Sequence, residues 1–264
     1  MTKLLIIEGN TPARVAAGQA AATAFLRSFD ALGAKVVCDV LNPFDAPVTA
    51  TDFASVDGVI FSGSGEAWSV DAPEVAVQRQ AMEHALAADL PIWGSCNGMQ
   101  LAMVVFGGAC GKAPAGKEVG VARDLVLTAA GESHAMMDGR CSGFGAPSMH
   151  RDHITRLPDR ACLLAGNHHS SVQAVVYETE NVQVWATQYH PELSPADVAG
   201  YIRSQGIYED ETAILPDLDQ AEDDANAARR LGANPGDLLV QGRATELGNW
   251  LRFVKERAGR QSVS

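Results

Sequence analysis

The sequence predicts an α/β fold, a three-layer sandwich around a mostly parallel, flavodoxin-like central sheet. In the first hundred residues, short apolar runs alternate with helical stretches at the spacing of βαβ units. The run at 58–61 is apolar on both faces, as expected of a parallel strand that helices cover on both sides. Beyond Gly108, β-rich runs follow one another with little helix between them, which favours antiparallel or mixed strands in the second half.

The elements of the first half follow from the residues that separate them. Thr11 and Pro12 supply an N-cap and a proline suited to a first helical turn, and the alanine-rich stretch after them predicts one helix that ends before Gly33. A second helix is expected to open at Pro73. The expected strands of this half are 3–7, 35–40, 58–61 and 91–93, and the expected helices are 11–32 and 73–88.

The second half is expected to complete one domain, residues 1–205, and to continue into a helical extension, residues 206–264, that packs on this domain. Within the extension, 209–224 holds eight acidic residues and no basic one. An apolar stripe at helical spacing in 234–255 predicts a long amphipathic helix that packs against its own domain, the alternative being a second subunit. The expected strands of this half are 121–127, 161–164, 172–177 and 182–187, and the expected domain helix is 195–204.

The composition excludes several classes of protein. The chain holds 20 Lys and Arg against 32 Asp and Glu, a formal net charge of −12, which disfavours nucleic acid and anionic membranes as partners.

Five cysteines without a C-x-x-C pair indicate neither a disulfide scaffold nor structural zinc, so we expect no metal and no cofactor. The adjacent His168 and His169 should point to opposite faces, with no carboxylate cluster beside them. The first apolar run is too short for a signal peptide, which favours a cytoplasmic location.

The sharpest chemical signal is the stretch 91–100, in which a short strand runs into Gly-Ser-Cys-Asn-Gly and then into an apolar helix. The pattern Gly-x-Cys-x-Gly matches a nucleophile elbow with sulfur in place of oxygen. The two glycines leave room for a sharp turn with a strained central residue, and the turn sets the thiol at a helix N-terminus, which favours thiolate. Cys96 is therefore the candidate nucleophile, and the alternative is a buried structural cysteine.

A thiol nucleophile needs a base, and the base needs a group that orients it. The segment 188–192, Gln-Tyr-His-Pro-Glu, directly follows an expected strand. His190 and Glu192 are two residues apart, which puts both side chains on one side of an extended segment, and Pro191 stops the strand. The two residues are the candidate base and its carboxylate. Taken alone, the motif would be interpreted as a surface loop.

Together the two motifs resemble those of the class I, or triad, glutamine amidotransferases, above all the amidotransferase domain of GMP synthetase. The resemblance covers about residues 1–205, and four further pieces agree with it in order. Residues 58–65 are similar to the family's oxyanion loop after the third strand, and residues 106–108 are similar to a helix end. Residues 117–120 are similar to the Glu-x-Gly segment, and residues 149–154 with the following Leu-Pro are similar to the His-Gly-Asp turn.

The resemblance implies a role for each matching residue. Cys96 would attack the side-chain amide carbon of glutamine to give a thioester, His190 would transfer the protons, and Glu192 would hold His190. The backbone N–H groups of Ser64 and Asn97 would form the oxyanion hole. The substrate-binding positions would be Gly63, Gln100 and Arg151.

Two departures from the family bear on the substrate. Gly-Ser-Gly at 63–65 stands where members commonly have Gly-Gly-Pro, which leaves open whether the oxyanion hole is preformed. Arg151 stands where synthetase-type domains have glycine. Its guanidinium would either bind a carboxylate, which suits a γ-glutamyl peptide better than free glutamine, or face solvent.

Three functions remain open at this point. The first is hydrolysis of glutamine with release of ammonia to a synthetase, which would be a separate chain because 206–264 contains no phosphate-binding Gly-rich loop. The second is a stand-alone γ-glutamyl hydrolase or peptidase that uses the same triad. The third is a non-catalytic relative with a binding or regulatory role. The expected ligand is glutamine or another γ-glutamyl compound.

Overall fold

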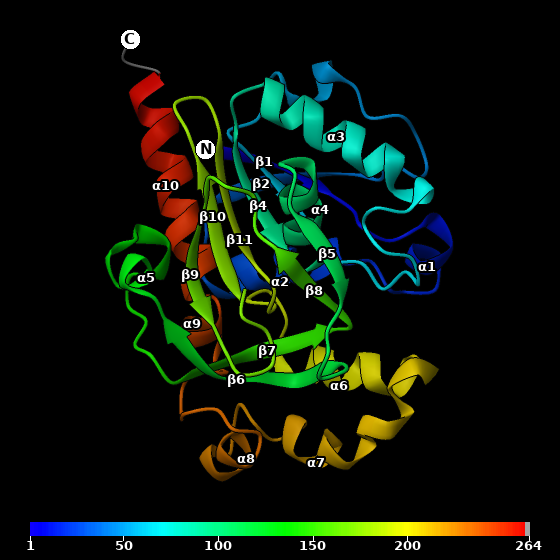
Figure 1. Cartoon of the computed structure of the whole chain (residues 1–264), viewed down its shortest axis with the longest axis vertical. Helices are drawn as coiled ribbons and strands as arrows, with labels where there is room; N and C mark the ends of the chain where they lie inside the picture. The colour runs from blue at the N-terminus through cyan, green and yellow to red at the C-terminus, as the bar shows by residue number, and fades with distance from the viewer. Residues whose placement is uncertain (262–264) are drawn as a thin grey trace.

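The computed structural model describes residues 1–261, in which a nine-stranded sheet lies between layers of helices (Figure 1). From one edge to the other, the strands are β2 (Val36–Leu41), β1 (Thr2–Ile7), β3 (Gly58–Phe61), β4 (Pro91–Ser95), β11 (Gln183–Thr187), β10 (Ala174–Glu178), β9 (Ala161–Gly166), β6 (Glu118–Leu127) and β7 (Phe144–His150). The strands from β2 to β11 run parallel, and the strands from β11 to β7 pair antiparallel. The predicted α/β class, with a flavodoxin-like parallel core and an antiparallel second half, is confirmed.

Helices cover both faces of this sheet, and a small antiparallel pair of strands, β5 (Ala109–Lys112) and β8 (Asp152–Arg156), lies beside it. Within residues 1–261, no helix combines the length and the apolar character that crossing a membrane requires. The α-helices are α1 (Pro12–Ala16), α2 (Ala22–Ala31), α3 (Ala76–Ala87), α4 (Asn97–Val105), α5 (Ala129–Ser133), α6 (Pro195–Ser204), α7 (Leu215–Leu218), α8 (Ala225–Arg230), α9 (Val240–Arg243) and α10 (Thr245–Gln261). The 3₁₀ turns are η1 (Ala50–Phe53), η2 (Pro73–Val75), η3 (Ala135–Met137) and η4 (Gly206–Ile214).

Several predicted elements differ from the structure for local reasons. The predicted helix 11–32 is interrupted at Gly18, whose φ of +81° lies outside the helical region, so α1 and α2 are separate. The predicted helix 234–255 begins only with α9. Its first residues form a turn in which the Asp237 carboxylate accepts from the backbone N–H of Asn234 at 2.8 Å. Strand β7 is missing from the prediction because glycine and proline interrupt its β-forming residues.

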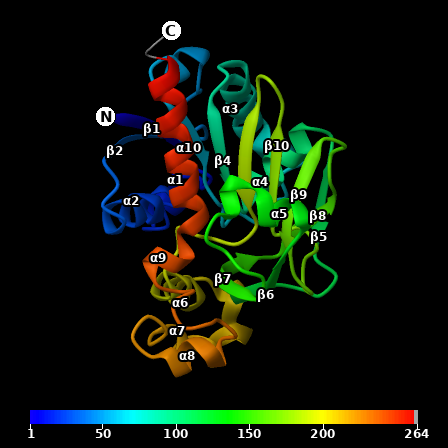
Figure 2. The same ribbon diagram turned by 90° about the vertical axis from the view of Figure 1, so that its left-hand side faces the viewer.

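Alternate residues of β1 divide the core into two halves. Leu4 and Ile6 pack with the apolar side chains of α2 and α10, and Leu5 and Ile7 pack with those of α3 and α4. All four side chains are at most 2% exposed. Figure 2 shows α2 and α10 on one side of the parallel strands and α3 and α4 on the other. The sheet is therefore covered on both faces, as its continuous apolar strands require.

The last helix, α10, is an integral part of one helical layer. Trp250 of α10 is fully buried, and its ring centroid lies 6.2 Å from that of Trp93 in β4. Phe253 stacks on Trp185 of β11 with ring centroids 4.9 Å apart. Because full burial of a large apolar side chain stabilises a fold by about 1.5–3 kcal/mol, these contacts anchor α10 firmly on the sheet.

A buried ion pair of α10 also contacts the segment that follows β11. Arg140 donates to the two carboxylate oxygens of Glu246 at 2.7 and 2.9 Å. The hydroxyl of Tyr189, the residue before His190, donates to Glu246 as well, at 2.8 Å. Removing one member of such a pair typically costs about 3–5 kcal/mol, because the other charge is left buried without its partner. The position of His190 therefore depends on the packing of α10.

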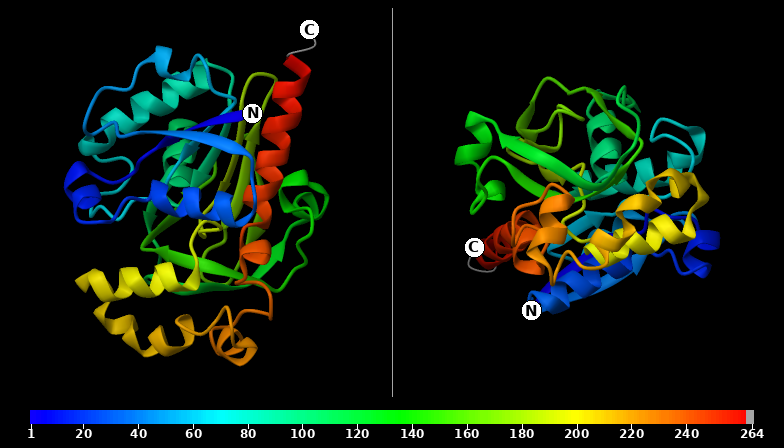
Figure 3. Two further views of the ribbon diagram at one scale, coloured as in Figure 1. Left: turned by 180° about the vertical axis from the view of Figure 1, so that it is seen from behind. Right: turned by 90° about the horizontal axis from the view of Figure 1, so that it is seen from below.

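Helices α6, α7 and α8 form a separate layer below β6 and β7 (Figure 3). An apolar cluster that includes Val121 of β6, Val198 of α6 and Leu218 of α7 holds this layer in place. The acidic stretch 209–224 lies in η4, α7 and the turn after them. Some of its carboxylates pair with arginines, as Asp217 does with Arg230 at 2.7 Å.

Candidate active site

The two candidate motifs follow adjacent strands. β4 and β11 are parallel neighbours, with Ser95 opposite Thr187, so Cys96 and His190 both lie at the carboxyl edge of the sheet. This edge is where open α/β sheets bind their ligands. A Cβ atom at Gly63 would lie 2.9 Å from His190 Cε1 and 3.8 Å from Cys96 Cβ. The side chains of Cys96 and His190 thus lie against the same glycine.

Cys96 occupies a strained turn for which its neighbours leave room. Its φ of +48° lies in a region that residues other than glycine rarely adopt. A Cβ at Gly98 would lie 2.2 Å from the carbonyl oxygen of Phe61, and a Cβ at Gly94 would lie 2.9 Å from the backbone of Gly98. The backbone N–H of Cys96 donates to the carbonyl of Thr187 at 2.8 Å, which ties the turn to β11. The glycines of the Gly-x-Cys-x-Gly pattern are therefore required by close backbone contacts.

His190 is held by a carboxylate and a hydroxyl. Its Nδ1 donates to Glu192 Oε1 at 2.7 Å, and Ser95 Oγ donates to the same oxygen at 2.8 Å. The exposed fractions of His190 and Glu192 are 7% and 3%. The sequence-based prediction gives Ser95 no role. The feature of the sequence that could have pointed to it is its position directly before the candidate nucleophile, Cys96.

The surroundings of His190 change its proton affinity. Burial lowers the pKa of the imidazole, but the charge of Glu192 and the charge and hydrogen bond of Cys96 together outweigh this effect. As a result, the pKa of His190 lies well above its ordinary value of 6.5. A proton held on His190 at neutral pH is available for transfer to a leaving group.

A residue of α9 supports the turn that carries His190. Arg243 is 5% exposed and donates to the carbonyl of Pro191 at 2.8 Å and to Ser28 Oγ at 2.9 Å. Ser28 Oγ in turn donates to the carbonyl of Glu192 at 2.8 Å. Burial lowers the pKa of Arg243, although nearby carboxylates act in the opposite direction. The sequence does not predict this role of Arg243, because nothing about a lone arginine in an amphipathic helix indicates that it contacts the His190 turn.

Two glutamine side chains lie beside Cys96. Gln188 Nε2 donates to Cys96 Sγ at 3.3 Å, and Gln188 Oε1 accepts from Gln100 Nε2 at 3.0 Å. Gln100 Nε2 also donates to the carbonyl of Asp152 at 2.9 Å. The predicted substrate-binding residue Gln100 is therefore engaged in bonds within the site. Gln188 is part of the Gln-Tyr-His-Pro-Glu motif, but it has no role in the sequence-based prediction.

The loop after β3 has a defined peptide orientation. The carbonyl oxygen of Gly63 accepts from Ser62 Oγ at 3.0 Å and faces Gly9, at which a Cβ would lie 2.3 Å from that oxygen. The Cα of Gly63 faces the cysteine and histidine side chains instead. In a trans peptide, C=O and N–H point in opposite directions. The N–H of Ser64 therefore points away from Gly9.

Arg151 lines a cavity of about 330 Å³ that opens on Cys96. Its guanidinium donates to the carboxylate of Asp152 at 3.0 and 3.1 Å and to the carbonyl of Ala67 at 2.9 Å. Arg151 thus bridges the β7–β8 turn and the loop after β3, and it is half-buried rather than free in solvent. Lys117 adds a second cationic group to the same cavity.

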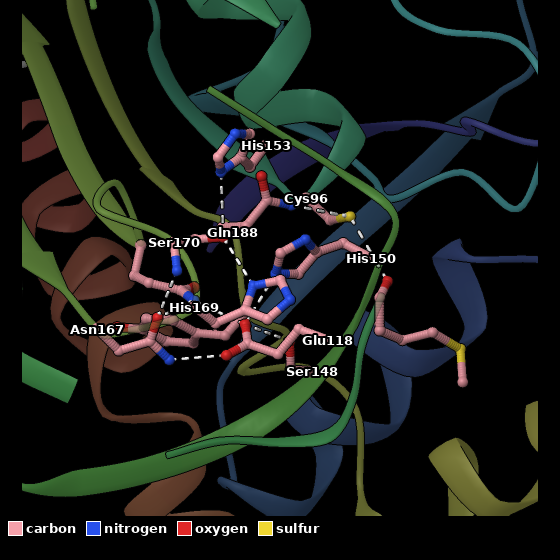
Figure 4. Close-up of polar contacts among 12 residues, drawn as sticks. Cys96, Glu118, Ser148, His150, His153, Asn167, His169, Ser170 and Gln188 are labelled. Carbon is pink, nitrogen blue, oxygen red and sulfur yellow. Dashed lines mark hydrogen bonds and ion pairs between the residues drawn. The ribbon is translucent and has the colours of Figure 1, made fainter. Parts of the chain in front are cut away.

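A cluster of polar side chains lies beside Cys96 and Gln188 (Figure 4). Glu118 of β6 accepts from His150 Nε2 at 2.8 Å, from Gln173 Nε2 at 2.7 Å and from Asn167 Nδ2 at 2.7 Å. Burial raises the pKa of Glu118, but these hydrogen bonds and the attraction of His150 outweigh it, so the pKa is lowered overall.

The sequence shows no carboxylate cluster beside His169, but the fold brings one carboxylate, Glu118, close to it. The pairing of β6 with β7 places Glu118 opposite His150, and ligand atoms of Glu118, His150 and His169 lie within 4.8 Å of one another. Such side chains are metal ligands in other proteins. Here the two oxygens of Glu118 already accept hydrogen bonds from four side chains. The arrangement is therefore best described as a hydrogen-bonded cluster that supports the β7–β8 turn.

Comparison with known proteins relates these motifs to a family. The model of the family "Glutamine amidotransferase class-I" matches residues 16–205. A protein of a Pseudomonas species named gamma-glutamyl-L-1-hydroxyisopropylamide hydrolase is 33% identical, with 76% of this chain and 71% of that protein aligned. A glutamine-hydrolyzing GMP synthase subunit of Methanocaldococcus jannaschii is 26% identical over 56% of this chain and 70% of that protein. A glutamine amidotransferase structure from Thermotoga maritima shares the fold, with a TM-score of 0.64, 18% identity and coverage of 96% of this chain and 98% of that one.

Proposed function

Because the chain belongs to the class I glutamine amidotransferase family, we propose that it hydrolyses γ-glutamyl amides, glutamine among them, to glutamate and a free amine through a thioester on Cys96. The observation that carries this proposal is the buried arrangement of Cys96, His190 and Glu192, with the sulfur on a strained turn. The Pseudomonas relative, whose name describes a γ-glutamyl amide hydrolase, supports this substrate class.

In the first half-reaction, the sulfur of Cys96 attacks the γ-carbonyl carbon, and a C–S bond forms while the carbonyl electrons move onto oxygen. When the tetrahedral intermediate collapses, the C–N bond breaks, and the leaving nitrogen keeps the electron pair and takes a proton from His190. Glu192 orients the imidazole through the 2.7 Å hydrogen bond and stabilises its positive charge. The products of this step are a thioester and a free amine.

In the second half-reaction, the neutral His190 takes a proton from water as the water oxygen attacks the thioester carbon. The C–S bond then breaks, the sulfur of Cys96 leaves with its electron pair, and glutamate is released. One water molecule is consumed for each amide bond broken. The raised pKa of His190 favours the first half-reaction, in which the imidazole must donate its proton.

The oxyanion of both tetrahedral intermediates is assigned to two backbone donors, the N–H groups of Ser64 and Asn97. The orientation of the Gly63 peptide supports the first donor, because its carbonyl faces Gly9 and the Ser64 N–H points away from Gly9. Asn97 opens helix α4, where backbone N–H groups have no partner within the helix. Removal of one such donor typically lowers the rate by about 10²–10³-fold.

The glutamyl end of the substrate is assigned to the cavity on the Cys96 side. Its α-carboxylate would lie near Lys117 and Arg151, and its α-ammonium near Asp152 and Glu66, which line the same cavity. The geometry gives Arg151 a bridging role, so we expect it to act mainly by holding the β7–β8 turn in place.

Supply of ammonia to a separate synthetase chain is the second candidate. It is supported by the relatives that are named as subunits of a glutamine-hydrolyzing GMP synthase. The chemistry at Cys96 is the same in both cases, and the difference lies in what accepts the leaving nitrogen.

The test is a comparison of kcat/KM for glutamine and for N-alkyl γ-glutamyl amides with the wild-type chain and with Cys96→Ala. We expect Cys96→Ala to abolish activity on every substrate, and the matched variant Cys141→Ala, at an exposed cysteine, to retain it. Activity that survives Cys96→Ala would refute the mechanism. Activity confined to glutamine would favour the second candidate.

A further inference from the structure

The sulfur of Cys96 has a hydrogen-bond donor besides the imidazole of His190. Gln188 Nε2 donates to Cys96 Sγ at 3.3 Å, and Figure 4 shows the Gln188 side chain beside the sulfur. Both side chains are buried, Gln188 completely. In a buried site, a hydrogen bond to an ionised acceptor is stronger than the same bond in water. The contact therefore favours the thiolate, which is the nucleophilic form of cysteine.

The orientation of the Gln188 amide follows from a single backbone carbonyl. A glutamine amide has a donor end and an acceptor end, and only the donor end stabilises a thiolate. The carbonyl oxygen of Asp152 can only accept, so the end of Gln100 that lies 2.9 Å from it is the NH₂ group. The same NH₂ group lies 3.0 Å from Gln188, which therefore presents its oxygen to Gln100. The NH₂ group of Gln188 is left to face the sulfur.

The hydrogen-bonded cluster around Glu118 holds this arrangement in place. His150 Nδ1 donates to the carbonyl of Asp152 at 3.0 Å, and His150 Nε2 donates to Glu118 at 2.8 Å. The backbone of Gln188 is fixed as well, because its N–H donates to the carbonyl of Gln173 at 2.8 Å. The side chain of Gln173 in turn donates to Glu118 at 2.7 Å. A continuous chain of hydrogen bonds thus runs from Glu118 to the sulfur.

The other groups at the sulfur differ from Gln188 in what they can do. The carbonyl oxygen of Met149 lies 3.9 Å from Cys96 Sγ. A carbonyl accepts from a thiol and repels a thiolate, so this contact opposes ionisation. His190 favours the thiolate only while it carries its second proton, which it gives up during the reaction. Gln188 is a neutral donor that keeps its protons, so it stabilises negative charge on the sulfur at every stage.

On the basis of the function proposed above, we propose that Gln188 is a further catalytic residue, which stabilises the thiolate of Cys96, and that Gln100 is its positioning residue. Gln188 stabilises the sulfur before the C–S bond forms. It does so again when the C–S bond of the thioester breaks and the electron pair returns to sulfur. No proton moves to or from Gln188 in either step. Gln100 acts on the sulfur through Gln188, not on the substrate.

The experiment follows alkylation of Cys96 by iodoacetamide as a function of pH, with peptide mapping to separate Cys96 from the other cysteines. It needs no substrate, so it reports on the sulfur alone. Gln188→Met has a similar length but no N–H donor, and we expect the pH of half-maximal alkylation to rise by about one unit. Gln188→Glu keeps the bond from Gln100 but puts a carboxylate beside the sulfur, and it should raise this pH further. The matched control Gln80→Met, at an exposed position of α3, should leave it unchanged.

Gln100→Met separates positioning from substrate binding. Without Gln100, the Gln188 amide is free to turn, so the pH of half-maximal alkylation should rise, though by less than in Gln188→Met. A residue that only bound the substrate would raise KM for glutamine and leave the alkylation profile unchanged, and that result would overturn the positioning role. For Gln188→Met itself, kcat for glutamine should fall by about 10-fold with little change in KM.

The two Gln188 variants decide the catalytic assignment, and urea denaturation establishes that each is folded. An alkylation profile that matches the wild type in a folded variant would overturn the role of Gln188 while the thioester mechanism stands. If Gln188→Met does not fold, Gln188→Glu decides alone. A wild-type chain that is alkylated at Cys96 but cleaves no γ-glutamyl amide would refute the proposed function instead.

Discussion

The turn that carries Cys96 and the turn that carries His190 lie side by side but are held in different ways. The Cys96 turn is fixed by its own neighbours, because Gly94 and Gly98 allow the close backbone contacts that accompany the positive φ. The His190 turn is fixed by distant segments, above all by Arg243 of α9. A turn that is fixed by its own neighbours leaves a pattern in the sequence. A turn that is supported by a distant segment does not.

The largest expected effect comes from breaking the His190 turn at Glu192. Glu192→Gln keeps the shape of the side chain and removes the charge that raises the pKa of His190. We expect kcat/KM for glutamine to fall by about 10⁴-fold, as for the matching change in serine proteases. With the carboxylate gone, the pKa of His190 falls, so the alkaline limb of the pH profile of kcat/KM should move to lower pH.

The measurement for this variant is the pH dependence of kcat/KM for both chains. The matched control is Glu180→Gln, at an exposed position beyond β10, which should leave the profile unchanged. An unchanged alkaline limb in Glu192→Gln would show that this carboxylate does not set the protonation of His190.

The second effect comes from breaking the Cys96 turn at Gly98. Gly98→Ala puts a Cβ at 2.2 Å from the Phe61 carbonyl oxygen, so the backbone of β3 or α4 must move. We expect the free energy of unfolding to fall by about 3 kcal/mol, in the upper range of overpacking changes. Gly248→Ala in α10 is the matched control, since nothing outside the adjoining backbone of its own helix lies within 4 Å of its added Cβ, and it should be neutral or slightly stabilising. Urea denaturation of the two variants measures the difference, and equal stabilities would show that Gly98 is not sterically required.

The smallest effect is expected from Arg243→Met, which removes the support of the His190 turn from α9. The carbonyl of Pro191 then loses its buried donor, which costs about 1–3 kcal/mol of stability. Since Arg243 acts by positioning, kcat for glutamine should fall by about 10-fold with little change in KM, and Arg243→Lys should restore part of the loss. Steady-state kinetics beside Arg229→Met, an exposed arginine of α8, checks this. A KM effect with an unchanged kcat would contradict the positioning role.

The sequence predicts what local patterns encode. It places the parallel strands correctly, and the glycines around Cys96 indicate the turn that the structure contains. It misses contacts that only tertiary packing creates. The pairing of β6 with β7 places Glu118 opposite His150 and close to His169, and no spacing in the chain predicts this contact. The apolar stripe of α10 is visible in the sequence, but its packing of Trp250 on Trp93 is not.

The same distinction applies to the cavity beside His190. Tyr201, Gln205 and Tyr208 stand at the junction of α6 and η4, and nothing in their spacing relates them to a histidine that follows β11. Their place beside His190 depends on how this segment folds under β6 and β7, which is set by apolar contacts of α6 and α7 with the sheet.

The central claim is that Cys96 alone among the cysteines acts as a nucleophile toward γ-glutamyl compounds. Intact-protein mass measurement after incubation with a chloroketone analogue of glutamine tests it most directly. We predict a single adduct, located on Cys96 by peptide mapping, while Cys141 and Cys162 stay unmodified although they are exposed. Adducts on Cys141 or Cys162 before Cys96, or equal labelling of the Cys96→Ala variant, would contradict the account.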